Sequence, residues 1–133
     1  ILLAKGGALT EAFAEVAPLR TPSDFVKGSA KFSDYRLIYS NTACNGELFR
    51  RLSPGATPVV THFHELDMGY HWLGAKNIAE VMRHTRHFIA CAQAVASRLE
   101  SVFAVPSARI SVHYEMIDGG LLAKNPRGNE AAL

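Results

Sequence analysis

The sequence has 133 residues, of which 48% are apolar and 20% charged, and its net charge is +2. This length fits one domain with a single core. The mean hydropathy of +0.04 is typical of a soluble globular protein, which excludes a disordered chain. No apolar run approaches the roughly 20 residues that a membrane-spanning helix needs. The basic residues form no long block, so charge gives no argument for nucleic acid and we expect no nucleic-acid partner.

The cysteines and the first residues indicate the cellular compartment and whether the chain is part of a longer protein. Cys44 and Cys91 lack a CxxC spacing, and their apolar or helical surroundings predict buried free thiols in a reducing compartment. The chain opens directly on Ile1, without Met and without a charged and apolar leader. We therefore expect it to be an internal part of a longer cytoplasmic protein.

Short apolar runs alternate with helical patterns along the chain. Residues 1–4 are predicted to form a buried strand, with Gly6 and Gly7 as its turn, and residues 9–17 a helix that ends at Pro18. Residues 21–33 indicate only a short helix and a connection. The pattern then predicts strands over 35–40, 58–61, 87–91 and 109–113, helices over 43–52, 75–85 and 93–103, and a tail over 119–133. Such alternation predicts a parallel sheet with right-handed crossovers.

Residues that could take part in binding or catalysis follow three of these strands. Ligands of parallel α/β sheets bind outside the carboxyl ends of the strands, so we expect these residues to converge on one rim. Gly6 and Gly7 would let a backbone approach an anionic or polyhydroxyl ligand, although a tight turn is the more common role of such a pair. Asn41 and Thr42 suit either sugar hydroxyls or an ordinary helix cap.

The third strand end carries two histidines and a carboxylate. His62 and His64 stand at i and i+2 on an extended segment and point the same way, as metal ligands would. Asp67 does not complete the usual hydrolase pattern, so we predict no metal, and a metal hydrolase that also uses His113 is a minor alternative. His64 suits a donor to a developing negative charge or a sugar hydroxyl, or a satisfied strand-end histidine. Glu65 would orient a neighbour or the acceptor, or begin the next helix.

A small basic cluster, Arg83, His84, Arg86 and His87, ends the helix predicted over 75–85. A solvated helix end that complements the helix dipole explains it without a function. The functional alternative is peripheral contact with anionic lipid headgroups at the inner membrane face, which would suit a lipid-linked substrate.

Four segments, taken in order, resemble the N-terminal domain of group 1 (family 4-like) retaining glycosyltransferases, which have two Rossmann-like domains facing across a cleft. These segments are Leu37–Leu48, Pro58–Leu66, Phe88–Val95 and Ile110–Asp118. The resemblance implies a doubly wound, mostly parallel α/β sheet over residues 1–118 that lacks its first strand. Residues 119–133 would be a tail or the start of an interdomain linker. Glu115-Met116 stands where the family commonly has Asn-Gly, and Ala92 where it usually has Ser.

The resemblance also implies an activity and a set of roles. The activity is transfer of a sugar, with retention, from a nucleoside diphosphate donor to a sugar or lipid-linked hydroxyl acceptor in polysaccharide biosynthesis, without a cofactor. The nucleotide would be held by a C-terminal domain of the same protein, so this chain alone would be inactive. His64 matches the family histidine that contacts the donor, and His64 and Glu65 would be catalytic. The substrate-binding residues would be Gly6, Gly7, Asn41, Thr42 and His62. A nonenzymatic sugar- or partner-binding module is the alternative from another class.

Overall fold

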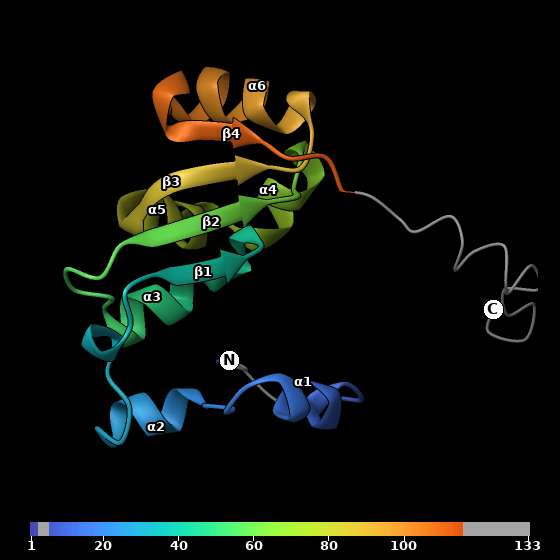
Figure 1. Ribbon diagram of the computed structural model, residues 1–133. Coiled ribbons are helices and arrows are strands. Elements are labelled where there is room, and N and C mark those ends of the chain that lie inside the picture. Colours follow the sequence, from blue (N-terminus) through green and yellow to red (C-terminus); the bar gives the residue numbers. More distant parts are fainter. Residues whose placement is uncertain (3–5, 116–133) are drawn as a thin grey trace, which may run out of the picture.

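The computed structural model describes residues 1–2 and 6–115, and its centre is a parallel β-sheet packed against helices (Figure 1). The four strands lie in the order β1-β2-β3-β4, and each pairs in parallel with the next. The strands are β1 Ile38–Asn41, β2 Val59–Phe63, β3 Thr85–Ala90 and β4 Ile110–Val112. The α-helices are α1 Thr10–Val16, α2 Pro22–Val26, α3 Gly46–Leu52, α4 Asp67–Leu73, α5 Ala75–His84 and α6 Gln93–Phe103, and the 3₁₀ turns are Phe32–Asp34, Ala43–Asn45 and Ser107–Arg109. The predicted Rossmann-like α/β class with a parallel sheet is confirmed.

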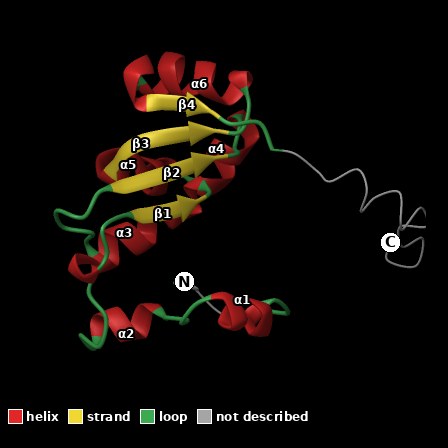
Figure 2. Ribbon diagram, in the orientation of Figure 1, coloured by secondary structure: helices red, strands yellow, loops and turns green. Residues whose placement is uncertain are grey.

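The helices that connect the strands pack on one face of the sheet. Because right-handed crossovers advance across the sheet in one direction from β1 to β4, α3, α5 and α6 reach the same side (Figure 2). The core lies between that face and these helices, and its members are Phe49, Val59, Phe63, Ile78, Val81, Phe88, Val95 and Leu99. Within residues 1–2 and 6–115 no helix covers the opposite face, which carries Tyr39, His62 and His87. We call it the open face. The second helix layer of a doubly wound sheet is therefore not part of the described structure.

Most predicted elements are present, with small shifts at their ends. The helix predicted over 93–103 coincides with α6. Strand β2, predicted over residues 58–61, buries alternate residues: Val59, Thr61 and Phe63. Helix α4 lies in a segment for which the sequence predicted no helix, because Gly69 and the aromatic residues around it have modest helix propensity. Gly69 is required there, since a Cβ atom would lie 2.8 Å from the Cβ of Glu65.

The N-terminal segment does not form the predicted unit of strand and helix on the sheet. Leu2 makes a single parallel bridge with Arg20 outside the sheet, Ile1 is 42% exposed, and residues 3–5 lie outside the described range. Helix α1 forms, but none of its residues is buried. The apolar residues of α1 recur with the helical period, but they are not buried in a core. Periodicity therefore predicted that the helix forms, and not how it packs.

The two cysteines lie in different environments. Cys91 is partly buried, and this burial raises the pKa of its thiol, whereas Cys44 is exposed, so the prediction that both thiols are buried is wrong for Cys44. Cys44 follows the tip of β1 in the Ala43–Asn45 turn, where its Sγ lies 3.3 Å from the hydroxyl oxygen of Thr42. Among the described helices none is long and apolar enough to cross a membrane. The tail predicted over 119–133 lies outside the described residues.

Close packing of α3 against α5 fixes the turn that follows β1. A Cβ atom on Gly46, the first residue of α3, would lie 1.9 Å from the backbone oxygen of Asn77 in α5. The side chain of Asn77 also links α5 to the turn and to α3, because it donates to the Ala43 carbonyl at 2.6 Å and accepts from the Glu47 amide at 3.1 Å. The tip of β1 is thus tied to α5 by contacts that allow no side chain at residue 46.

We predict that Gly46→Ala destabilises the protein, because the new methyl group collides with backbone that cannot rotate away. The free energy of unfolding, measured by urea denaturation, should fall by about 2 kcal/mol or more. Gly7→Ala is the matched control, since a Cβ atom there meets nothing within 4 Å. Equal stability of the two variants would contradict the assigned role of Gly46.

Candidate functional site

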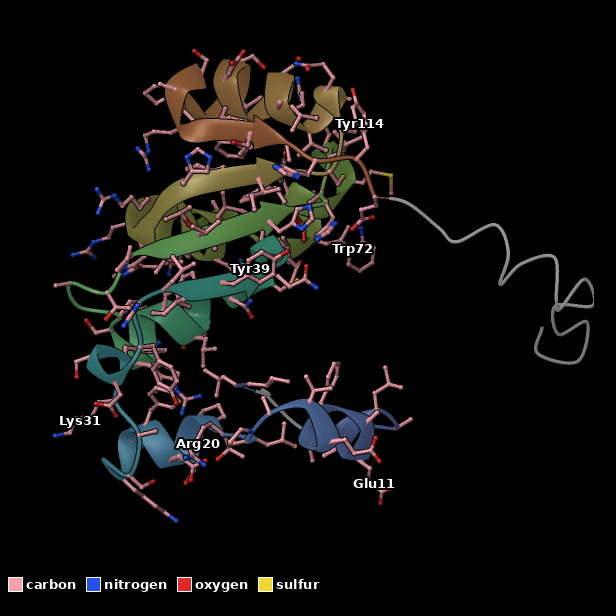
Figure 3. All side chains as sticks on the ribbon, viewed as in Figure 1. Glu11, Arg20, Lys31, Tyr39, Trp72 and Tyr114 are labelled. Carbon is pink, nitrogen blue, oxygen red and sulfur yellow. The ribbon has the colours of Figure 1, made fainter. Side chains whose placement is uncertain are left out.

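The carboxyl ends of β1 and β2 bring five of the predicted site residues together. In the register of these strands Asn41 lies beside His62, and the Thr42 amide continues the pairing by donating to the His62 carbonyl at 2.9 Å. His64 and Glu65 follow immediately beyond the end of β2. Figure 3 shows Tyr39 on the open face of the sheet, and Trp72 and Tyr114 at the end of the molecule to which the strands point. We call this end of the sheet the carboxyl rim.

His64 is held at the rim by two polar partners. Its Nε2 lies 2.8 Å from Oδ1 of Asn41, and its Nδ1 lies 2.9 Å from Oε1 of Glu115. Because an amide oxygen only accepts, Nε2 carries a proton and donates it to Asn41. The His64 side chain is 28% exposed and that of Glu115 61%, so solvent reaches this pair. An oriented and partly exposed imidazole suits a group that meets a substrate.

His62 sits deeper on the open face and has a different environment. Its Nδ1 lies 2.7 Å from the Tyr39 hydroxyl, and its ring packs 4.2 Å from the His64 ring, measured between centroids. Burial, and next the charge on neighbouring His64, lower the pKa of His62, which favours the neutral imidazole. Within the described range its Nε2 is buried without a hydrogen-bond partner. His62 therefore carries an unused nitrogen beside His64.

Glu65 organises the backbone of the rim. One carboxylate oxygen accepts from the Thr42 hydroxyl and from the Ala43 amide at 3.1 Å, and the other accepts from the His64 amide at 3.0 Å. Thr42 has φ of 77°, a conformation that costs a β-branched residue about 1–3 kcal/mol and that these bonds compensate. Neither Thr42 nor Glu65 makes a side-chain helix cap: Thr42 uses its hydroxyl on Glu65, and α4 begins two residues later.

A shallow hollow continues the rim towards α4 and α6. It is lined by Glu65, Leu66, Asp67, Met68, Gly69, Ala94 and Arg98. Nε of Arg98 donates to Oδ1 of Asp67 at 2.8 Å, and both side chains remain substantially exposed. An Arg98–Asp67 ion pair thus borders the hollow beside Glu65.

The other candidates lie away from this group. In the described part of the chain, the backbone of Gly7 exchanges hydrogen bonds with the Thr10 hydroxyl at the start of α1, and neither Gly6 nor Gly7 bonds to a rim residue. Three strand ends were expected to converge, and this expectation is wrong for the end marked by Gly6 and Gly7. Asp67 is engaged by Arg98 rather than by the histidines. The basic cluster begins in the last turn of α5 and continues into the first residues of β3, at the amino end of that strand, with Arg83 and His84 beside Glu80.

Sequence reasoning missed Tyr39, Arg98 and Glu115 as members of the site. Tyr39 could have been found from the period of two, because it shares a strand face with Asn41. Glu115 follows the end of β4 and could have been included when strand ends were compared. Arg98 lies inside a helix, and no local pattern distinguishes it from other surface arginines.

We predict that Glu65→Gln weakens the fold, because a glutamine amide nitrogen cannot accept the hydrogen bonds that now reach both carboxylate oxygens. Urea denaturation should show a loss of about 2 kcal/mol in the free energy of unfolding. Glu47→Gln is the matched control, since Glu47 pairs with Arg50 on the exposed surface and its replacement should change little. Wild-type stability of Glu65→Gln would exclude this organising role.

Comparison with known proteins identifies one family. The model of the family described as Glycosyltransferase Family 4 matches residues 16–119, which is more than half of the chain. No curated protein and no solved structure gives a significant match. The matched range includes all four strands and every rim residue named above.

Proposed function

Because the chain belongs to Glycosyltransferase Family 4, we propose that it forms the acceptor-side domain of a retaining, nucleoside-diphosphate-sugar-dependent glycosyltransferase. A hydroxyl group, on a sugar or a lipid-linked acceptor, would receive the sugar. A C-terminal domain of the same protein would hold the nucleotide and close over the carboxyl rim. The reaction needs charge stabilisation at the departing diphosphate and precise placement of the acceptor.

The observation that carries this proposal is the position of His64. It is oriented by Asn41, reachable from solvent, and located at the end of a parallel strand, where ligands of such sheets bind. With Nε2 bonded to Asn41, Nδ1 is the atom that would meet the donor. Nδ1 lies 2.9 Å from the Glu115 carboxylate, and a proton on this nitrogen would be donated to a sugar hydroxyl or a diphosphate oxygen when the donor replaces that carboxylate.

The neighbouring residues would position rather than react. Both oxygens of Glu65 already accept bonds from the chain itself, so Glu65 would act through Thr42 and the His64 backbone. Asn41 would hold the imidazole ring in place. The hollow beside Glu65 would receive the acceptor, and Arg98 at its border offers a positive charge.

We predict that His64→Ala lowers the rate of sugar transfer about 100-fold or more, because one donor to developing charge is lost. The rate is measured on the whole protein with a radiolabelled donor. His87→Ala is the matched control: His87 lies on the open face, bonded to Ser111, and its loss should leave transfer nearly unchanged. Near-normal transfer by a folded His64→Ala protein would remove His64 from this role.

The class of reaction has its own test. A panel of nucleoside diphosphate sugars is offered to the whole protein with hydroxyl acceptors, and the product anomer is identified by nuclear magnetic resonance. We expect turnover with one donor class and retention of the anomeric configuration. Inversion would contradict the proposed mechanism. Saturable sugar binding without turnover would favour a nonenzymatic binding module instead.

A further inference from the structure

We propose that His62, His64 and Glu115 form a binding site for a divalent transition-metal ion such as Zn²⁺. One ring nitrogen of His62, one ring nitrogen of His64 and a carboxylate oxygen of Glu115 all lie within 4.8 Å of one another. Two imidazole nitrogens and one carboxylate oxygen form a donor set typical of zinc sites that keep a fourth position open. Hard cations such as Mg²⁺ prefer all-oxygen ligands and fit this set poorly.

The hydrogen bonds around the two histidines support this assignment. Each ring uses one nitrogen on a protein partner: His62 Nδ1 contacts the Tyr39 hydroxyl at 2.7 Å, and His64 Nε2 contacts Asn41 at 2.8 Å. The second nitrogen of each ring is left for another partner: Nδ1 of His64 lies 2.9 Å from Glu115, and Nε2 of His62 has no partner among the described residues. Metal-binding histidines are oriented in this manner, because a bond at one ring nitrogen fixes the direction of the other.

An ion would also satisfy an atom that the protein alone does not. In the described range Nε2 of His62 is buried and lacks a partner, which is costly for a polar atom. A bound ion would give this nitrogen a partner, and the Glu115 carboxylate, 2.9 Å from Nδ1 of His64, would supply a negative charge beside it.

The positions of the ligands allow the site to close. Ligand atoms around a tetrahedral zinc ion lie about 3.4 Å apart, given bonds of about 2.0–2.1 Å. His62 and His64 come from the end of β2 and are held by their partners, so little movement is available to them. Glu115 has a side chain that is 61% exposed and can swing to complete the site.

Metal binding has a consequence that rests on the proposed function. The ion would occupy Nδ1 of His64 and engage Glu115, so the same nitrogen could not donate to the sugar or the diphosphate. Bound Zn²⁺ should therefore inhibit sugar transfer. A chelator should restore the rate.

The test measures metal binding directly, without donor or acceptor. Zn²⁺ is titrated into the purified protein in competition with a chromogenic chelator, and Co²⁺ is added separately to record the visible absorption of a bound ion. We expect one equivalent of Zn²⁺ to bind. His62→Ala and Glu115→Ala should each weaken binding about tenfold or more, and Tyr39→Phe, which alters a partner of His62, should weaken it less. His71→Ala, which removes an exposed histidine of α4, should have no effect.

Each outcome decides the proposal. Absence of saturable Zn²⁺ and Co²⁺ binding, or binding unchanged by Glu115→Ala, would overturn it. Glu115 is exposed, so its variant remains informative even if circular dichroism shows that His62→Ala does not fold. If wild-type protein transfers sugar but binds no metal, only the metal site fails. If it binds metal through these residues but transfers no sugar, only the proposed function fails.

Discussion

The parallel pairing of β1 with β2 is the constraint on which the candidate site depends. Its register places Asn41 beside His62, and one further backbone bond joins Thr42 to the His62 carbonyl. Glu65 then turns back from the tip of β2 to accept from Thr42, Ala43 and His64. A slip of one residue would move every side chain of β2 to the opposite face, sending His62 and His64 towards the core. Strand register and the carboxylate of Glu65 therefore act together to assemble the rim.

Alternating apolar and helical patterns were sufficient to predict that the residues at the carboxyl ends of β1 and β2 lie together. Parallel strands deliver their carboxyl ends to one edge, so Asn41, Thr42, His62, His64 and Glu65 could be grouped without coordinates. The prediction succeeded because it used only the order and direction of strands. Its assigned roles for these residues remain predictions, since neighbouring positions do not reveal which group meets a substrate.

Other features required information that local patterns do not contain. Helix α1 has the expected period, yet its apolar side chains are exposed, because period does not tell which surface a helix will meet. Gly6 and Gly7 were grouped with the rim on the assumption that residues 1–4 join the sheet, and Leu2 instead bridges Arg20. Glu115 joins His64 across the sheet, from the end of β4 to the end of β2. Such a contact depends on side-chain reach, which a strand assignment leaves undetermined.

The two histidines of the rim differ in which ring nitrogen the protein engages. Asn41 bonds Nε2 of His64 and leaves Nδ1 beside Glu115, whereas Tyr39 bonds Nδ1 of His62 and leaves Nε2 without a partner among the described residues. In the proposed transfer reaction, a donor substrate would meet Nδ1 of His64. A metal ion, in contrast, requires both nitrogens at once. Under the two proposals, the Asn41 bond would matter both for sugar transfer and for metal binding, whereas the Tyr39 bond would matter for metal binding.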